Sequence, residues 1–322
     1  MSKSLTDENQ TREVRRILTG PTASGKSAVA AQMYQLLAGA ARPLSLISMD
    51  SMLVYRRLNV VTAKPTPAEL LQTPLACVDL TDPSESFSVA KYLAAAEEAE
   101  RRAFENAHTA VFVGGTGLYL KSLTRGLFDG PAADPALRES LSARAAGEGA
   151  ESLHFELLQN DPQAAAKIHP RDRKRIIRAL EVFHSTGRTI SSYQKQWNAE
   201  PFVASKIVSL RIEKPELNKR IEARVDWMLQ NGLLTEIESV RAGGLSKEAR
   251  AAVGVREVIE LLDGKISLEE CRIVMIRRTK ELARRQATWF RSFPEMVWID
   301  AGANRSVSDI ARDVIRALDI TC

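Results

Sequence analysis

The sequence has few of the features that mark secreted, membrane-embedded or zinc-dependent proteins. Its three cysteines, Cys77, Cys271 and Cys322, are far apart, odd in number and form no CxxC pair. A disulfide framework or a structural zinc site is therefore not expected. The four histidines have no metal-ligand spacing, and no apolar run is long enough to span a membrane. Because the polar residues 1–16 do not resemble a secretory signal, we expect a protein of the reducing cytoplasm with no membrane partner.

The composition is that of an ordinary globular protein with a modest excess of positive charge. The 322 residues are 44% hydrophobic, enough to bury the core of one large domain or two smaller ones. The formal net charge is +5. Many basic proteins bind no nucleic acid, so this charge is only a weak indication of a polyanionic partner.

The first part of the chain alternates strands and helices. Apolar segments at 14–18, 44–49 and 109–113 predict buried strands, and 26–37 and 89–106 predict helices. This order is typical of a parallel sheet with crossover helices. The sequence therefore predicts an α/β fold, a P-loop NTPase-like parallel sheet flanked by helices.

The pattern changes after residue 128. Asp134-Pro135 and Asp161-Pro162 each resemble a helix N-cap followed by proline, and Gly187 is a natural end for a helix that starts near 171. We expect an all-helical insertion domain at 129–206. A strand at 206–212, helices at 215–231 and 268–293, and a strand at 297–300 then return to the catalytic core, which comprises 1–128 and 207–322.

The strongest local signal is a phosphate-binding loop that matches G-x-x-x-x-G-K-[ST] between a predicted strand and a predicted helix. Glycines allow the backbone to fold round a phosphate, lysine adds a positive charge, and the last hydroxyl can hold Mg²⁺. A GTPase is poorly supported, because no DxxG or NKxD motif follows, whereas a small-molecule kinase remains open. The diphosphate-binding residues predicted here are Gly20, Pro21, Thr22, Ala23, Ser24, Gly25, Lys26 and Ser27, the last as the magnesium ligand.

Two further segments follow predicted strands and should open onto the same crevice. Asp50 ends the second strand, where a carboxylate can bind Mg²⁺ or accept a proton, although a turn or capping role is equally compatible with its position. Gly114-Gly115-Thr116-Gly117 follows the third strand and permits close approach of a ligand. Taken alone, this second loop is equally compatible with a simple strand-to-helix turn.

Taken together, these stretches resemble the tRNA dimethylallyltransferase family. The matching motifs, in order, are Gly20-Pro21-Thr22-Ala23-Ser24-Gly25-Lys26-Ser27, Asp50-Ser51-x-x-Val54-Tyr55, Thr62-Ala63-Lys64-Pro65, Gly114-Gly115-Thr116-x-Leu118-Tyr119, Ile168-His169-Pro170 with Arg178-Ala179-Leu180-Glu181-Val182, and Arg285-Gln286-x-x-Trp289-x-Arg291. The chain departs from the family pattern at Val61, where glycine is usual, at Arg171, where asparagine is common, and at Val255, where an aromatic is usual. The zinc finger of many eukaryotic members is absent, which favours a bacterial-type enzyme.

The resemblance implies a chemistry for the loop. Dimethylallyl diphosphate would occupy it with Mg²⁺, Lys26 and Arg224 would stabilise the leaving pyrophosphate, and Asp50 would accept a proton from the N6 amine of an adenosine beside the tRNA anticodon, at position 37. A monomer is expected. By the same resemblance, the positions expected to contact tRNA are Asp50, Ser51, Met52, Leu53, Thr116, Arg138, Lys174, Arg175, Ile176, Ile177, Arg178, Arg250, Arg256, Arg284, Arg285, Gln286 and Arg291.

Two basic clusters, at 167–178 and 272–291, contain almost no acidic residues of their own and favour an RNA partner. Arg277, Arg284 and Arg291 recur every seven residues and so share a helical face. Trp289 is interpreted as a packing residue. Three alternatives remain: an adenylate isopentenyltransferase acting on free AMP or ATP, a P-loop kinase, and a non-catalytic RNA-binding protein.

Overall fold

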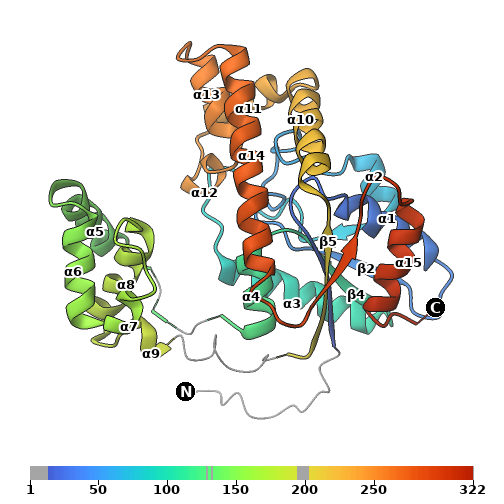
Figure 1. Cartoon of the computed structure of the whole chain (residues 1–322), viewed down its shortest axis with the longest axis horizontal. Coiled ribbons are helices and arrows are strands. Elements are labelled where there is room, and N and C mark those ends of the chain that lie inside the picture. The colour runs from blue at the N-terminus through green and yellow to red at the C-terminus, as the bar shows by residue number, and fades with distance from the viewer. Residues whose placement is uncertain (1–13, 128–129, 132, 194–202, 322) are drawn as a thin grey trace. The chain divides into compact units, whose positions relative to one another are not determined.

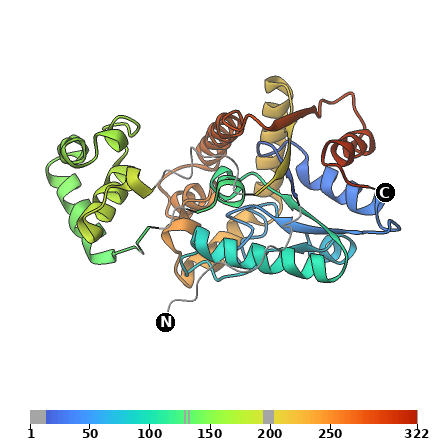
Figure 2. The ribbon, with the colours of Figure 1, turned by 90° about the horizontal axis from the view of Figure 1, so that it is seen from below.

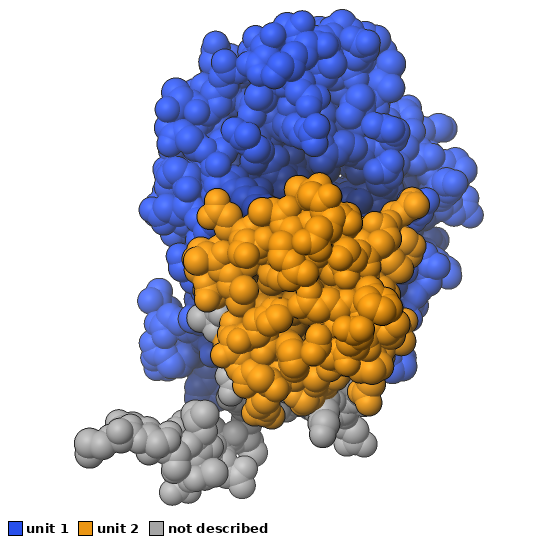
Figure 3. Space-filling model, turned by 90° about the vertical axis from the view of Figure 1, so that its left-hand side faces the viewer, with its two compact units in different colours: residues 1–124, 203–322 blue, residues 125–202 orange. Residues whose placement is uncertain are grey.

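The computed structural model describes residues 14–127, 130–131, 133–193 and 203–321. The chain divides into two compact units (Figure 3), Met1–Thr124 with Val203–Cys322, and Arg125–Phe202. The second unit corresponds to the expected insertion at 129–206, with bounds slightly earlier at both ends. The strand ladder resumes before 206, because the backbone N–H of Arg15 already donates to the carbonyl of Ala204.

A six-stranded sheet forms the centre of the first unit (Figure 1), with strand order β3-β2-β4-β1-β5-β6. Every pairing is parallel, as expected for buried strands joined by crossover helices. The strands are β1 Arg15–Thr19, β2 Leu44–Ser48, β3 Leu75–Ala76, β4 Thr109–Val113, β5 Ser205–Arg211 and β6 Met296–Asp300. The expected α/β class is confirmed, with β3 as an additional edge strand.

Helices cover both faces of this sheet (Figure 2). Leu18 and Leu46 point to one face and pack in a cluster with α1 (Lys26–Leu36) and α15 (Val307–Ala317). Ile17, Ile47 and Phe112, one residue out of phase, point to the other face and pack with α3 (Val89–Glu105) and α4 (Gly117–Arg125). Alternating strand side chains therefore supply two cores, and the loops at the strand ends are held between them.

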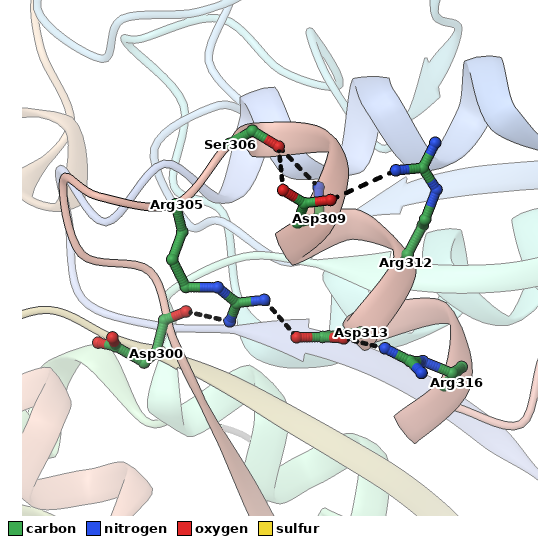
Figure 4. A network of polar contacts seen from close by, with 7 residues as sticks. All are labelled: Asp300, Arg305, Ser306, Asp309, Arg312, Asp313 and Arg316. Atoms are coloured by element: carbon green, nitrogen blue, oxygen red, sulfur yellow. Dashed lines mark hydrogen bonds and ion pairs between the residues drawn. The ribbon is translucent and has the colours of Figure 1, made fainter.

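Helix α15 is further held at its start by polar contacts (Figure 4). Arg305 donates to the carbonyl of Asp300 at the end of β6 and pairs with Asp313, which also pairs with Arg316. Ser306 caps the helix by accepting the N–H of Asp309.

A helical layer lies against the loop that follows β2. It comprises α10 (Lys214–Gln230), α11 (Leu233–Ala242), α12 (Lys247–Arg250), α13 (Val255–Leu262) and α14 (Leu268–Phe290), and it shares one apolar cluster with residues 54–61. Figure 1 shows α10 and α14 side by side, rising from the end of the sheet. Helix α14 ends at Phe290 rather than at the expected 293.

Of the described residues, none belongs to a helix long and apolar enough to cross a bilayer. The short α2 (Pro67–Gln72) precedes β3.

The second unit is all helical in its described part, as the sequence predicts. Its helices are α5 (Pro135–Gly147), α6 (Ala150–Asn160), α7 (Pro162–Ala165), α8 (Arg173–Thr186) and α9 (Ile190–Tyr193). Asp134 and Asp161 act as the N-caps that the Asp-Pro pairs predict, and Gly187 ends α8 in the left-handed conformation. Helix α8 starts at Arg173 rather than near 171, because the Asp172 side chain caps it.

Candidate functional site

The phosphate loop joins the end of β1 to the start of α1. Gly25 has φ of 87°, a left-handed conformation that glycine adopts without strain and that turns the chain directly into the helix. The ammonium of Lys26 donates to the carbonyl oxygens of Gly20 and Pro21, each at 2.8 Å. The side chain of Ser27 is exposed at the first turn of α1. A positive charge and a hydroxyl thus lie at a helix N-terminus, which is suited to a phosphate group.

The middle of the loop faces a pocket. The N–H of Ser24 donates to the carbonyl of Pro21 at 3.2 Å and tightens the turn, in which Ala23 also has a positive φ of 63°. Of the eight loop residues, Thr22 lines a pocket of about 380 Å³ in the first unit. The loop therefore presents its tip, rather than its whole length, to this cavity.

The loop after β4 is wedged against the end of β2. A side chain at Gly114 would overlap the backbone of Met49, so this position accepts no Cβ. Thr116 accepts a hydrogen bond from the N–H of Ser51 at 2.9 Å through its hydroxyl. This contact joins the two segments that the sequence predicts to face one crevice, and Asp50, Ser51, Met52 and Thr116 all line the pocket.

Asp50 uses one of its carboxylate oxygens locally. Its Oδ1 accepts the N–H of Met52 at 2.8 Å, which fixes the turn after β2. Leu53, expected near the same substrate, lies outside the pocket lining, and its carbonyl accepts the N–H of Asp79 instead. Asp50, Ser51 and Met52 therefore line the pocket and Leu53 does not, and the expected contact of these residues with tRNA remains a prediction.

Gln286 of α14 connects the two loops. Its Oε1 accepts the N–H of Thr22 at 2.8 Å, and its Nε2 donates to the carbonyl of Gly115 at 2.9 Å. The sequence motif assigns Gln286 to tRNA contacts, and in the structure its amide also holds the phosphate loop beside the second loop. Its place in the Arg-Gln motif gives no sign of this bridge, which depends on tertiary packing.

The pocket wall is completed by a stripe on α14 that the sequence reasoning missed. Met275, Leu282 and Trp289 recur every seven residues and line the cavity, with Arg278 and Arg285 beside them. Trp289, interpreted as a packing residue, does pack closely on Gly117 but also faces the pocket. The available signal was the apolar residue that recurs every seven positions between the arginines, two positions before each member of the arginine stripe identified from the sequence.

Arg278 is held in the pocket wall by a buried carboxylate. Its guanidinium pairs with Glu257, whose side chain is buried and whose other oxygen accepts the N–H of Gly254 at 2.8 Å. Glu257 thus caps α13 and orients Arg278 at once. This pairing gives α14 a fixed cation inside the pocket.

Three charged groups interact electrostatically at the loop end of the cavity. Burial lowers the pKa of Lys26 to about 8, while Asp50 acts to raise it and Arg224 to lower it. Burial also lowers the pKa of Arg224, and Asp50 opposes this effect. Arg224 lines the pocket and donates to the carbonyl of Thr62 at 2.9 Å. The three residues named from the sequence as catalytic are therefore electrostatically coupled.

The basic cluster on α14 is more neutralised than its own sequence indicates. Neighbouring helices supply partners: Asp226 for Arg272 at 2.5 Å and Glu222 for Lys280 at 2.6 Å. The cations that remain exposed, with no acidic partner among the described residues, are Arg277, Arg284, Arg285 and Arg291. Arg250 and Arg256 are also exposed, next to the pocket-lining segment 251–253, although Arg256 pairs with Glu260 at 3.0 Å.

The second unit carries the other expected tRNA contacts. Lys174 and Arg175 are exposed on α8. Ile176 is fully buried in the core of this unit and Ile177 is half-buried, so the expectation is wrong for the Ile176 side chain, because the helix turns this position inward.

Two arginines of this unit have a structural partner. Arg138 and Arg178 both pair with the buried Glu181, at 2.9 and 2.7 Å. The Arg138 pair joins α5 to α8, whereas the Arg178 pair lies within α8, and Arg178 also donates to the carbonyl of Pro131 at 2.8 Å.

The comparisons with known proteins agree with this arrangement. The family model described as IPP transferase matches residues 53–293. The tRNA dimethylallyltransferase of Geobacter sulfurreducens is 39% identical over 300 residues, which are 92% of this chain and 94% of that protein. The tRNA dimethylallyltransferase 1 of Trichlorobacter lovleyi is 40% identical over 286 residues, 88% of this chain and 92% of that protein.

Solved structures give the same result. The full-length tRNA isopentenylpyrophosphate transferase of Bacillus halodurans is 32% identical and superposes with a TM-score of 0.69, covering 96% of this chain and 97% of that one. A eukaryotic dimethylallyltransferase acting on tRNA is 25% identical with a TM-score of 0.75, covering 90% and 74%. The chain therefore belongs to the IPP transferase family.

Proposed function

We propose that this protein transfers a dimethylallyl group from dimethylallyl diphosphate to the N6 amine of the adenosine next to the anticodon, position 37, in tRNA. The observation that carries the proposal is that Thr22 of the phosphate loop, Asp50 and Arg224 line one pocket together with Arg278 and Arg285 of α14. Relatives named for this reaction match most of the chain.

In the proposed reaction the adenine N6 attacks the first carbon of the allylic chain, and the bond from that carbon to the diphosphate oxygen breaks. Lys26 and Arg224 stabilise the negative charge that develops on the departing pyrophosphate. Asp50 takes the proton that N6 loses as the new carbon–nitrogen bond forms. The target base must leave its stack to reach this depth, and the apolar wall of Met275, Leu282 and Trp289 offers a surface for it.

The residues present fit a Mg²⁺ ion shared with the substrate. The described part of the chain contains no cluster of three or more His, Cys, Asp or Glu that could hold a metal by itself. Mg²⁺ in phosphate sites keeps several waters and takes few protein ligands, so the Ser27 hydroxyl with diphosphate oxygens is a sufficient donor set. When bound, the ion neutralises charge on the leaving pyrophosphate.

The proposal is tested by incubating the purified protein with Mg²⁺, labelled dimethylallyl diphosphate and unmodified tRNA, with AMP and ATP as parallel acceptors. We expect label on the adenosine next to the anticodon. Label in AMP or ATP instead would assign the protein to free-nucleotide prenylation. No label in any acceptor, with protein that is folded and binds tRNA, would leave a kinase or binding function.

A further inference from the structure

Glu236 of α11 accepts hydrogen bonds from three consecutive backbone amides of the turn at 59–61, which lies in the loop between β2 and α2. Its Oε2 accepts the N–H of Asn59 and of Val60, each at 2.7 Å, and its Oε1 accepts the N–H of Val61 at 3.0 Å. Successive N–H groups that converge on one anion form a nest, a geometry that suits a carboxylate better than a neutral amide. The conformation of this turn therefore depends on a side chain from a helix more than 170 residues later in the sequence.

The same turn ends at the pocket. Val61 and the next residue, Thr62, line the cavity, and the carbonyl of Thr62 accepts the guanidinium N–H of Arg224 at 2.9 Å. Among the residues that the structure describes, this carbonyl is the hydrogen-bond partner of Arg224. The position of the Thr62 carbonyl therefore sets the orientation of the half-buried guanidinium of Arg224.

We propose that Glu236 is a positioning residue for the diphosphate site, acting through residues 59–61 and the Thr62 carbonyl to aim Arg224 into the pocket. This inference rests on the proposed function only in taking the bound anion to be a diphosphate. Glu236 itself lies outside the pocket lining. Its effect is therefore indirect, in contrast to that of Asp50 or Arg224.

The test compares Glu236→Gln with Glu238→Gln, a matched change at an exposed position of the same helix. The probe is inorganic pyrophosphate with Mg²⁺, measured by calorimetry, together with hydrogen exchange at amides 59–61. The glutamine at 236 turns an NH₂ group towards one of the three N–H donors. We expect Glu236→Gln to weaken pyrophosphate binding about tenfold and to speed exchange at 59–61, whereas Glu238→Gln changes neither.

A double-mutant cycle with Arg224→Ala separates positioning from general stability. If Glu236 acts through Arg224, Glu236→Gln adds no further loss of pyrophosphate affinity once Arg224 is gone. An equal loss in both backgrounds, or faster exchange at 59–61 with unchanged pyrophosphate affinity, overturns the proposal. Should Glu236→Gln not fold, Glu236→Asp, which keeps the charge but shortens its reach, enters the same cycle.

The pyrophosphate readout does not depend on prenyl transfer. If the wild-type protein transfers no dimethylallyl group to tRNA but the cycle behaves as expected, the proposed function fails and the role of Glu236 stands. If transfer is observed and the cycle is additive, the role of Glu236 fails alone.

Discussion

The two oxygens of the Asp50 carboxylate have different tasks. Oδ1 is committed to the N–H of Met52, while no hydrogen bond to Oδ2 is made by the described residues. The residue thus combines a structural contact with an oxygen available to the pocket. A substitution that keeps the first and removes only the basicity of the second can separate the two.

Asp50→Asn is that substitution, because its carbonyl oxygen can still accept the Met52 N–H. We expect the rate of prenyl transfer to fall by roughly 10²–10⁴-fold, since the amide cannot take the N6 proton. Binding of tRNA, measured by filter retention, should stay near that of the wild type, and Asp50→Ala should lose transfer to at least the same extent. Loss of tRNA binding together with transfer in both variants would mean that Asp50 is structural.

Lys26 gives the site a pH dependence. Burial lowers its pKa to about 8, so the ammonium that attracts a diphosphate is charged below that pH and lost above it. Pyrophosphate binding favours the charged form, and we expect proton uptake on binding between pH 8 and 9, detectable by calorimetry in buffers of different ionisation enthalpy. The protons exchanged by pyrophosphate itself are the same for the wild type and for Lys26→Met. Equal proton uptake by these two proteins would therefore contradict the assignment of the uptake to Lys26.

Among individual residues, those that the sequence could predict belong to short contiguous motifs. The phosphate loop and Asp50 stand out in the sequence because each belongs to a contiguous motif directly after a predicted strand, and their roles remain predictions. Gln286, Arg278 and Glu236 were assigned to other roles or missed, because each acts on a backbone group or a carboxylate far away in the chain. No local spacing encodes such a partner.

Among the elements, the central strands were the most predictable. Strand β4 is apolar on both faces and stands out as a nearly continuous run, and β2 has the apolar residues Leu46 and Ile47 on opposite faces. Strand β3, with two residues, and α12, with four, are too short for either period to be recognised. These two elements are stabilised by contacts with neighbouring elements, and such contacts cannot be recognised from the residues of the element itself.

Helices α5 and α8 depend on a buried carboxylate. Glu181 is fully buried, pairs with Arg138 and Arg178, and accepts the N–H of Asp134 at 2.7 Å. Removing it leaves these donors without their acceptor, although the partly exposed arginines can recover some hydration. The joint between the two helices therefore combines this buried polar network with the apolar cluster that they share.

We expect Glu181→Ala to lower the free energy of unfolding of the helical unit by about 2 kcal/mol. For a unit of this size that corresponds to a fall of ~10 °C in the midpoint of its transition, measured by scanning calorimetry of the full chain. Glu139→Ala, at an exposed position of α5, is the control. Similar midpoints for the two variants would mean that the Glu181 contacts contribute no net stability.

At the scale of the whole molecule, the charged residues that sum to a net charge of +5 are unevenly distributed. Ion pairs with α10 and α13 neutralise part of α14, whereas Arg277, Arg284 and Arg285 on this helix and Arg291 at its C-cap remain exposed. Arginines on α15, on the face of the sheet covered by α1, are instead paired with aspartates of the same helix (Figure 4). Position, more than total charge, should therefore decide which cations bind a phosphate backbone.

Arg284→Ala tests this distribution, with Arg312→Ala on α15 as a control that removes the same charge from the other face of the sheet. Each phosphate contact releases condensed counterions, so losing one should reduce the slope of log affinity for tRNA against log salt by about 0.7–1. We expect Arg284→Ala to bind tRNA more weakly at low salt with this shallower slope, and Arg312→Ala to follow the wild type. If both variants lowered the slope equally, the attraction would arise from net charge alone, and α14 would have no special role in holding the RNA.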